Sequence, residues 1–178
     1  MREAIERQRH AVAHWLSPGK GRVHFTQAPP GTGKTRIAAA CIAAALDRQP
    51  DSAVVATAMS NLPVTKLVIE SARAGIDVDM VAFFSGTACV KYNEQINELE
   101  NYLLEAKVKG ESYRNKLMAS ERRDVEQYLK DIGPRPRHAK EKAVAEVLLT
   151  RNFQRVVFAT TYMAAAIHNT HFNYASRN

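Results

Sequence analysis

A glycine-rich loop is the stretch of this sequence best equipped for chemistry. Residues 27–35 read Gln-Ala-Pro-Pro-Gly-Thr-Gly-Lys-Thr and fit the phosphate-binding pattern G-x-x-x-x-G-K-[ST], with Ala28 in the place of the first glycine. In such a loop, backbone N–H groups surround phosphates, the lysine contacts the β- and γ-phosphates, and the hydroxyl coordinates Mg²⁺. The pattern predicts binding of a nucleoside triphosphate with Mg²⁺ at Thr35. The predicted nucleotide-binding residues of the loop are Pro30, Gly31, Thr32, Gly33, Lys34 and Thr35.

The sequence around this loop predicts strands and helices in alternation. Short apolar runs are followed by segments rich in helix formers, an order typical of a parallel sheet covered by helices. The run at 52–58 is nearly all apolar, which predicts a strand buried on both faces of the sheet. Asn61 is the expected N-cap of the next helix. The expected strands are residues 22–27, 52–58, 78–84 and 155–160, and the expected helices are residues 5–16, 34–48, 62–74 and 161–167. The predicted fold class is α/β.

The composition changes between residues 91 and 151, where the chain is charged, poor in β-branched residues and almost without glycine. Breaks at Gly110 and at 133–136 divide it into three predicted helices. Leu117, Val125, Tyr128 and Leu129 fall on one broad face of the second helix. The predicted helices are residues 92–109, 112–131 and 137–151. We expect residues 91–151 to form a helical insertion between two parts of the sheet domain, residues 1–90 and 152–178.

The overall composition is that of a globular protein. The chain has 178 residues, of which 46% are hydrophobic and 24% charged. No apolar run approaches the roughly 20 residues that span a bilayer, and the N-terminus lacks the apolar core of a signal peptide. Two cysteines imply no disulfide framework. We therefore expect an intracellular protein, cytoplasmic or nuclear, without a membrane partner. The net charge of +7 is compatible with a polyanionic partner.

Three further motifs accompany the loop. Gln8 is followed by Ala-Val at positions 11 and 12, residues 57–64 read Thr-Ala-Met-Ser-Asn-Leu-Pro-Val, and residues 157–161 read Val-Phe-Ala-Thr-Thr. In this order, the motifs resemble the first RecA-like domain of a superfamily 1 helicase. Within that superfamily the chain is most similar to the branch that contains the RNA helicase of nonsense-mediated mRNA decay. The resemblance covers residues 5–167.

The resemblance implies ATP and Mg²⁺ as cofactors and single-stranded RNA or DNA as a partner. It implies that Gln8 contacts the adenine base, and that Ser60, Asn61 and Thr160 contact the nucleic-acid backbone. Asn61 also has the plain interpretation of a helix N-cap, and Thr160 that of a strand residue. The helical segment 91–151 stands where this branch carries a helical subdomain. The implied enzyme class is a nucleic-acid-dependent ATP hydrolase.

The sequence departs from the family pattern at the residues for hydrolysis. The family needs an Asp-Glu pair after an apolar strand to hold Mg²⁺ and position water, and no such pair follows an apolar strand here. The second RecA-like domain, which supplies arginines for the transition state, is also missing. We therefore expect an incomplete RecA-like domain that is inactive in ATP hydrolysis by itself.

Two alternatives stay open at the level of the sequence. The first is an inert nucleotide-binding regulator or a remnant of a helicase, which the missing acidic pair favours. The second is a hexameric AAA-type ATPase, which shares the Pro-Pro-Gly-Thr-Gly-Lys-Thr core. The long helical insertion and the Ser60-Asn61 motif stand against the second alternative.

Overall fold

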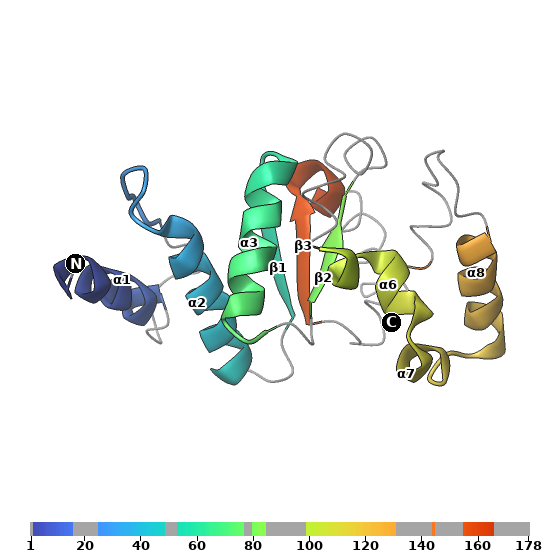
Figure 1. Ribbon diagram of the computed structural model, residues 1–178. Coiled ribbons are helices and arrows are strands. Elements are labelled where there is room, and N and C mark those ends of the chain that lie inside the picture. The colour runs from blue at the N-terminus through green and yellow to red at the C-terminus, as the bar shows by residue number, and fades with distance from the viewer. Residues whose placement is uncertain are drawn as a thin grey trace.

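Three apolar runs form a parallel sheet in the computed structural model of this chain. The structure describes residues 2–15, 25–48, 53–76, 80–84, 99–130, 144 and 155–165. Within these residues β1 (Val54–Ala58), β2 (Met80–Phe83) and β3 (Val156–Thr160) pair in the order β1-β3-β2, all in parallel. Parallel strands require crossover connections, and α3 (Asn61–Arg73) lies between β1 and β2 in the chain (Figure 1). The predicted α/β class is confirmed, and so is the parallel sheet.

One face of the sheet packs against α2 (Lys34–Arg48) and α3. Side chains alternate along a strand, so that Met80, Ala82 and Phe84 share this face with Val156 and Phe158. α2 contributes Ile42 and Leu46, and α3 contributes Val64 and Val68, in each case at the four-residue spacing that places side chains on one helix face. The bounds of α2 are the predicted ones. The α1 helix (Arg2–Trp15) packs on the side of α2 (Figure 1).

The helix α3 has well-defined ends. Its N-cap is Ser60 rather than the predicted Asn61, which is the first helical residue. At the other end Gly75 has φ 84°, its N–H donates to the carbonyl of Ala72 (2.9 Å), and the Ile76 N–H donates to that of Ser71 (3.3 Å). These two bonds form a Schellman motif, in which glycine adopts the left-handed conformation at no steric cost. The predicted stop at Gly75 is confirmed.

The other face of the sheet is covered by the helical segment. Val81 and Phe83 of β2 and Val157 and Ala159 of β3 form one cluster with residues of this segment. Leu117, Val125 and Tyr128 are buried in it and Leu129 packs against it, as their predicted common face requires. The segment consists of the 3₁₀ turn η2 (Glu100–Tyr102), α6 (Leu104–Lys109), α7 (Glu111–Arg114) and α8 (Ala119–Lys130), and the helices extend to the right of β2 in Figure 1. The apolar core of the helical segment is thus formed in part by side chains of β2 and β3.

The helical segment is more divided than the sequence predicted. The break at Gly110 is confirmed, since α6 ends at Lys109. The predicted helix 92–109 is wrong over 99–103, where the turn η2 and a bridge between Leu103 and Ala82 replace it. The predicted helix 112–131 is interrupted before α8, where the Met118 N–H donates to the Glu121 carboxylate at 2.7 Å. This bond caps the start of α8 and makes a new helix favourable there. The predicted helix 137–151 lies outside the described residues apart from the buried Val144.

Two strand predictions need correction. Residues 25–27 are not in a strand, and Phe25 is 94% exposed, while residues 22–24 lie outside the described part. The run 52–58 forms β1 as predicted, but it is not buried on both faces, since Val55 is 59% exposed. β1 stands at one end of the strand order. The buried cluster that includes side chains of α6, α7 and α8 contains strand residues from β2 and β3 but none from β1. One face of β1 therefore has no helix over it within the described residues.

Among the described residues, no helix has the length and apolar character that crossing a membrane requires.

Candidate functional site

The glycine loop, residues 27–35, turns the chain sharply into α2. Gly31 has φ 77° and Gly33 has φ 79°, a conformation that side chains with a Cβ rarely adopt. The Thr32 hydroxyl donates to the carbonyl of Pro29 at 2.7 Å and closes the turn. The Ile37 N–H donates to the Gly33 carbonyl (3.0 Å), so the N–H groups of residues 34–36 precede this first helical bond. The loop and the start of α2 therefore form an electropositive end suited to anions.

Lys34 is folded back over this loop. Its ammonium donates to the carbonyl of Ala28 at 2.9 Å and to that of Pro29 at 2.7 Å, and the side chain is exposed. An ammonium group has three N–H donors, two of which these bonds use. The charge of Lys34 thus lies at the mouth of the loop, beside the helix N-terminus.

Gln8 reaches the loop from α1. Its side-chain amide donates to the carbonyl of Thr32 at 2.8 Å, across 24 positions of the sequence. Its nitrogen lies so near Gly33 that a Cβ at that position would be 2.7 Å away. The structure therefore brings Gln8, Thr32, Gly33 and Lys34 together, four residues that the sequence assigned to one nucleotide site.

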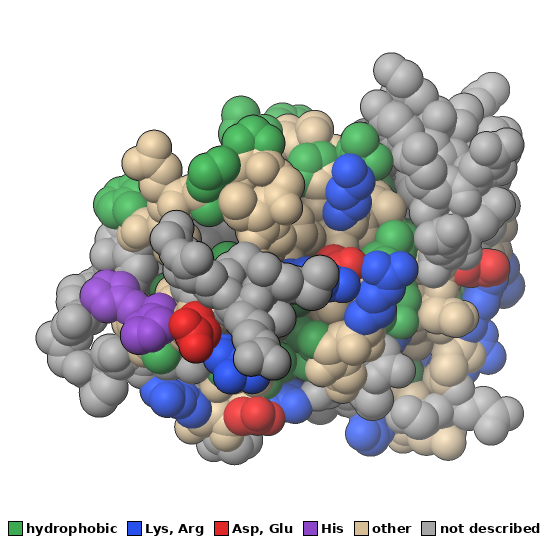
Figure 2. Space-filling model, turned by 60° about the vertical axis from the view of Figure 1, so that its left-hand side comes forward, with side chains coloured by type: hydrophobic (Ala, Val, Ile, Leu, Met, Phe, Trp, Pro, Cys, Tyr) green, Lys and Arg blue, Asp and Glu red, His purple; other side chains and the backbone are tan. Residues whose placement is uncertain are grey.

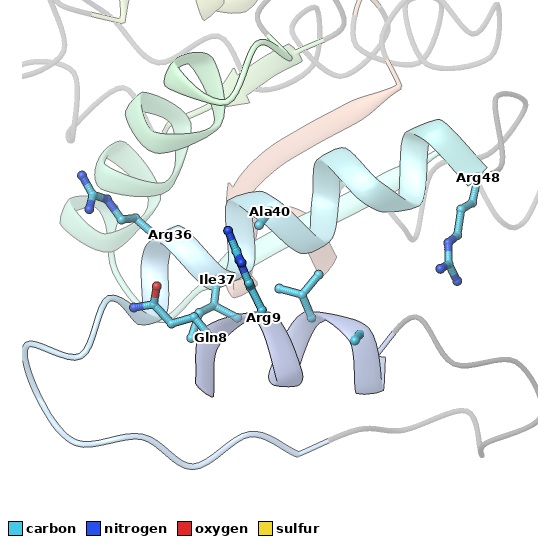
Figure 3. A pocket seen from close by; sticks show the side chains of 8 residues that line it. Gln8, Arg9, Arg36, Ile37, Ala40 and Arg48 are labelled. Atoms are coloured by element: carbon cyan, nitrogen blue, oxygen red, sulfur yellow. The ribbon is translucent and has the colours of Figure 1, made fainter. Parts of the chain in front are cut away.

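A pocket of about 520 Å³ lies between α1 and α2. We call it the α1–α2 pocket; its polar lining includes Gln8, Arg9 and Arg36, and Ile37 and Ala40 provide an apolar wall. Figure 3 shows Arg9 rising from α1 toward α2, with Gln8 at the end of the pocket nearest the glycine loop. Its size lies in the range of about 300–1,000 Å³ typical of sites for small ligands.

A second pocket, of about 460 Å³, lies between α2 and α3. We call it the α2–α3 pocket, and its lining includes Gly33 and Thr35, the predicted Mg²⁺ ligand. Its remaining lining residues are Arg36, Lys66, Ile69, Glu70 and Arg73. The two pockets thus flank the start of α2, with Gln8 in one and Thr35 in the other.

An ion-pair network stands in the α2–α3 pocket. The Glu70 carboxylate accepts from Arg36 Nε at 3.3 Å and from Arg73 Nη1 at 2.7 Å. Sequence reasoning missed this network. The only signal was the spacing of Glu70 and Arg73, which places them on one face of a helix. Arg36 comes from another helix, and its pairing depends on how α2 packs against α3.

The predicted nucleic-acid contacts lie at the carboxyl edge of the sheet. Ala58, the last residue of β1, is opposite Thr160, the last residue of β3, and Ser60 follows two positions after Ala58. The Thr160 hydroxyl accepts from the Met163 N–H at 3.3 Å, which gives it a helix-capping role. Ser60 is exposed and Asn61 half-buried. Figure 2 shows hydrophobic side chains along the upper rim of the molecule, where α3 begins in Figure 1. Ser60 and Asn61 therefore follow the end of β1, opposite the end of β3 at which Thr160 lies.

Protein ligands for a metal are few in this site. Within the described residues there is no group of three or more His, Cys, Asp or Glu side chains that could hold an ion. His10 and His14 are exposed on α1. A metal at the glycine loop would therefore take Thr35 as its side-chain ligand and its other ligands from the phosphates and water, as Mg²⁺ commonly does.

Comparison with protein-family models, curated proteins and solved structures finds no significant match to this chain.

Proposed function

We propose that this chain binds Mg·ATP at the glycine loop and is part of a superfamily 1 helicase motor. One observation carries the proposal. The Lys34 ammonium and the exposed N-terminus of α2 lie together at the glycine loop, and Gln8 contacts the same loop from α1. Preorganised N–H groups and a nearby ammonium favour a polyphosphate, since each charge-assisted hydrogen bond is about twice as strong as a neutral one.

Each residue has a distinct role in this proposal. Lys34 would exchange its bonds to the loop carbonyls for bonds to the β- and γ-phosphates, and Thr35 would hold Mg²⁺ by its hydroxyl. Gln8 would contact the base, because its amide has both donors and an acceptor for the edge of adenine. Gly31 and Gly33 would keep the backbone close to the phosphates.

The proposed nucleic-acid partner is single-stranded RNA or DNA, at the edge formed by Ser60, Asn61 and Thr160. These residues contribute hydroxyl and amide groups of the kind that contact phosphate and sugar, and the net charge of +7 favours a polyanion. ATP turnover by the isolated chain is not expected, because its sequence contains no Asp-Glu pair. A nucleotide-binding regulator without turnover is the second candidate, and the same absence favours it.

Equilibrium binding of Mg·ATP to the whole chain tests the proposal. We expect saturable binding of Mg·ATP to the wild-type chain. Lys34→Ala should weaken this binding by about 10- to 100-fold, because it removes a charge-assisted hydrogen bond worth about 1.5–3 kcal/mol. Lys130→Ala, at the exposed end of α8, is the matched control and should leave the affinity unchanged.

Two results would contradict the proposed binding site, and a third would contradict the expected lack of turnover. A folded wild-type chain that does not bind Mg·ATP would leave the loop without a nucleotide function. Equal binding by the wild-type protein and Lys34→Ala would move the nucleotide to another site. Hydrolysis that depends on Lys34 would contradict the expected inactivity and would identify the chain as a complete ATPase site.

A further inference from the structure

The α2–α3 pocket contains charged side chains to which the proposed function assigns no role. Arg36, Lys66 and Arg73 contribute three cationic side chains, and Glu70 contributes one carboxylate. The pocket also contains Gly33 and Thr35 of the glycine loop. A pocket with this excess of positive charge, open to the proposed phosphate site, is suited to an anion.

The positions of the two pockets indicate how a bound nucleotide would be oriented. Gln8, the proposed contact of the base, lines the α1–α2 pocket, whereas Thr35 lines the α2–α3 pocket. Thr35 would hold the Mg²⁺ that accompanies the β- and γ-phosphates of a nucleoside triphosphate. The terminal phosphate therefore belongs on the side of the α2–α3 pocket, and the base on the opposite side of α2. Figure 3 shows Arg36 directed away from α1, toward α3.

The two arginines are held in place but keep donors for a ligand. Arg36 is 74% exposed and Arg73 is 68% exposed, while the Glu70 side chain that pairs with both is only 20% exposed. A guanidinium has five N–H donors, and the described ion pair uses one of them on each arginine. Arg36 also stands in the first turn of α2, where the helix dipole disfavours a cation and an anion nearby relieves that cost.

We propose that Arg36 and Arg73, oriented by Glu70, bind the terminal phosphate of the nucleotide and make the site selective for a triphosphate over a diphosphate. This inference rests on the proposed binding of Mg·ATP at the glycine loop. The planar guanidinium matches two phosphate oxygens at once, which an ammonium cannot do. The selectivity would arise within this chain, without arginines from a second domain.

Parallel titrations with Mg·ATP and Mg·ADP test the inference. We expect the wild-type chain to bind Mg·ATP about tenfold more tightly than Mg·ADP, the effect of one charge-assisted contact to the extra phosphate. Arg73→Ala should lower the affinity for Mg·ATP about 5- to 10-fold and leave that for Mg·ADP unchanged within about twofold. Arg73→Lys should restore the affinity only in part, because the fork geometry is lost. Arg123→Ala, on the exposed side of α8, is the matched control.

The outcomes separate this inference from the proposal beneath it. If Lys34→Ala weakens both nucleotides but Arg73→Ala weakens neither, or weakens both equally, the arginine site is refuted and the glycine-loop site stands. If the folded wild-type chain binds neither nucleotide, both fail. Circular dichroism of each variant verifies that the fold is retained, and Arg73→Lys keeps the test decisive if Arg73→Ala does not fold.

Discussion

At the scale of single residues, Gly33 has the tightest surroundings of the glycines in the glycine loop. Gly31 and Gly33 have nearly the same positive φ, but a Cβ at Gly31 would meet nothing within 4 Å, whereas one at Gly33 would lie 2.7 Å from the Gln8 nitrogen. The two positions therefore share a left-handed backbone conformation, and of the two only Gly33 lies close to the Gln8 side chain of α1. Comparing alanine substitutions at the two positions therefore separates the free-energy cost of the backbone conformation from the cost of losing the Gln8 contact.

We expect Gly33→Ala to weaken Mg·ATP binding more than Gly31→Ala does. Both substitutions carry the strain of a left-handed residue with a Cβ, about 1–2 kcal/mol, but only Gly33→Ala displaces Gln8 from the loop. Urea denaturation measures the stability of each variant, and nucleotide titration measures its affinity. The control is Gln8→Ala combined with Gly33→Ala. If the double variant is weaker than Gln8→Ala by as much as Gly33→Ala is weaker than wild type, displacement of Gln8 is not the cause.

Residue types predicted part of the candidate site. The Gly-Thr-Gly-Lys-Thr run predicted a phosphate-binding loop. Its glycines allow positive φ, and its lysine and threonine supply an ammonium and a hydroxyl at the spacing of that motif. The resemblance assigned Gln8 to the nucleotide site as a contact of the base, but it did not predict the bond from Gln8 to the Thr32 carbonyl. The Arg36–Glu70–Arg73 network could not be predicted, because it depends on the rotation and depth with which α2 packs against α3.

At the scale of elements, the helical segment stabilises the sheet through buried side chains, among them Tyr113 of α7. Tyr113 is 6% exposed and packs in the cluster that contains Phe83 and Val157. Burial of the Tyr113 hydroxyl, together with the smaller effect of the negative charge of Glu121, raises its pKa to about 12. The folded state thus favours the neutral hydroxyl more strongly than the unfolded chain, in which tyrosine titrates near pH 10.

This pKa predicts a loss of stability in alkali. The contribution of Tyr113 is fully present below about pH 10 and is lost as the pH rises toward about 12, because the unfolded chain releases the proton first. We expect Tyr113→Phe to show a smaller fall in the free energy of unfolding across this interval. Urea denaturation at several pH values measures it, with Tyr162→Phe, at an exposed position, as the control. Identical pH dependence in Tyr113→Phe and wild type would contradict the assignment.

The elements themselves were predicted unevenly. The bounds of α2 and the stop of α3 at Gly75 followed from local signals, namely helix formers and a glycine that accepts positive φ. The predicted strand 22–27 was wrong over 25–27, because alternation of residue types says nothing about whether a neighbouring strand exists. The break around residues 100–103 depends on a contact with the sheet, the bridge between Leu103 and Ala82. The break before α8 coincides with the bond from the Met118 N–H to the Glu121 carboxylate.

At the scale of the whole molecule, β1 and β2 are the two edge strands of the sheet within the described residues, and β1 is the more exposed of them. In the described part of the chain β1 pairs with β3 on one side only, and Val55 is exposed on its uncovered face. An edge strand with an exposed β-branched residue is a template for pairing with another molecule. The helices cover β2 and β3 on both faces and leave β1 as the vulnerable strand.

We expect Val55→Lys to reduce self-association without loss of the fold. A lysine on the exposed face of an edge strand places charge where a second strand would dock, and Val55 contributes little to the core. Light scattering at rising protein concentration measures the association, and Val157→Lys, at a buried position of β3, is the contrasting variant that should unfold the protein. Unchanged association in a folded Val55→Lys variant would show that β1 is not the contact.

Amide hydrogen exchange with and without Mg·ATP is the measurement that tests the central claim most directly. It locates the ligand on the chain, whereas an affinity alone does not. We expect Mg·ATP to slow exchange at residues 31–36, in the glycine loop and the first turn of α2, and Lys34→Ala to abolish this protection. Unchanged exchange at residues 31–36 in the presence of saturating nucleotide, or protection that persists in Lys34→Ala, would contradict the account.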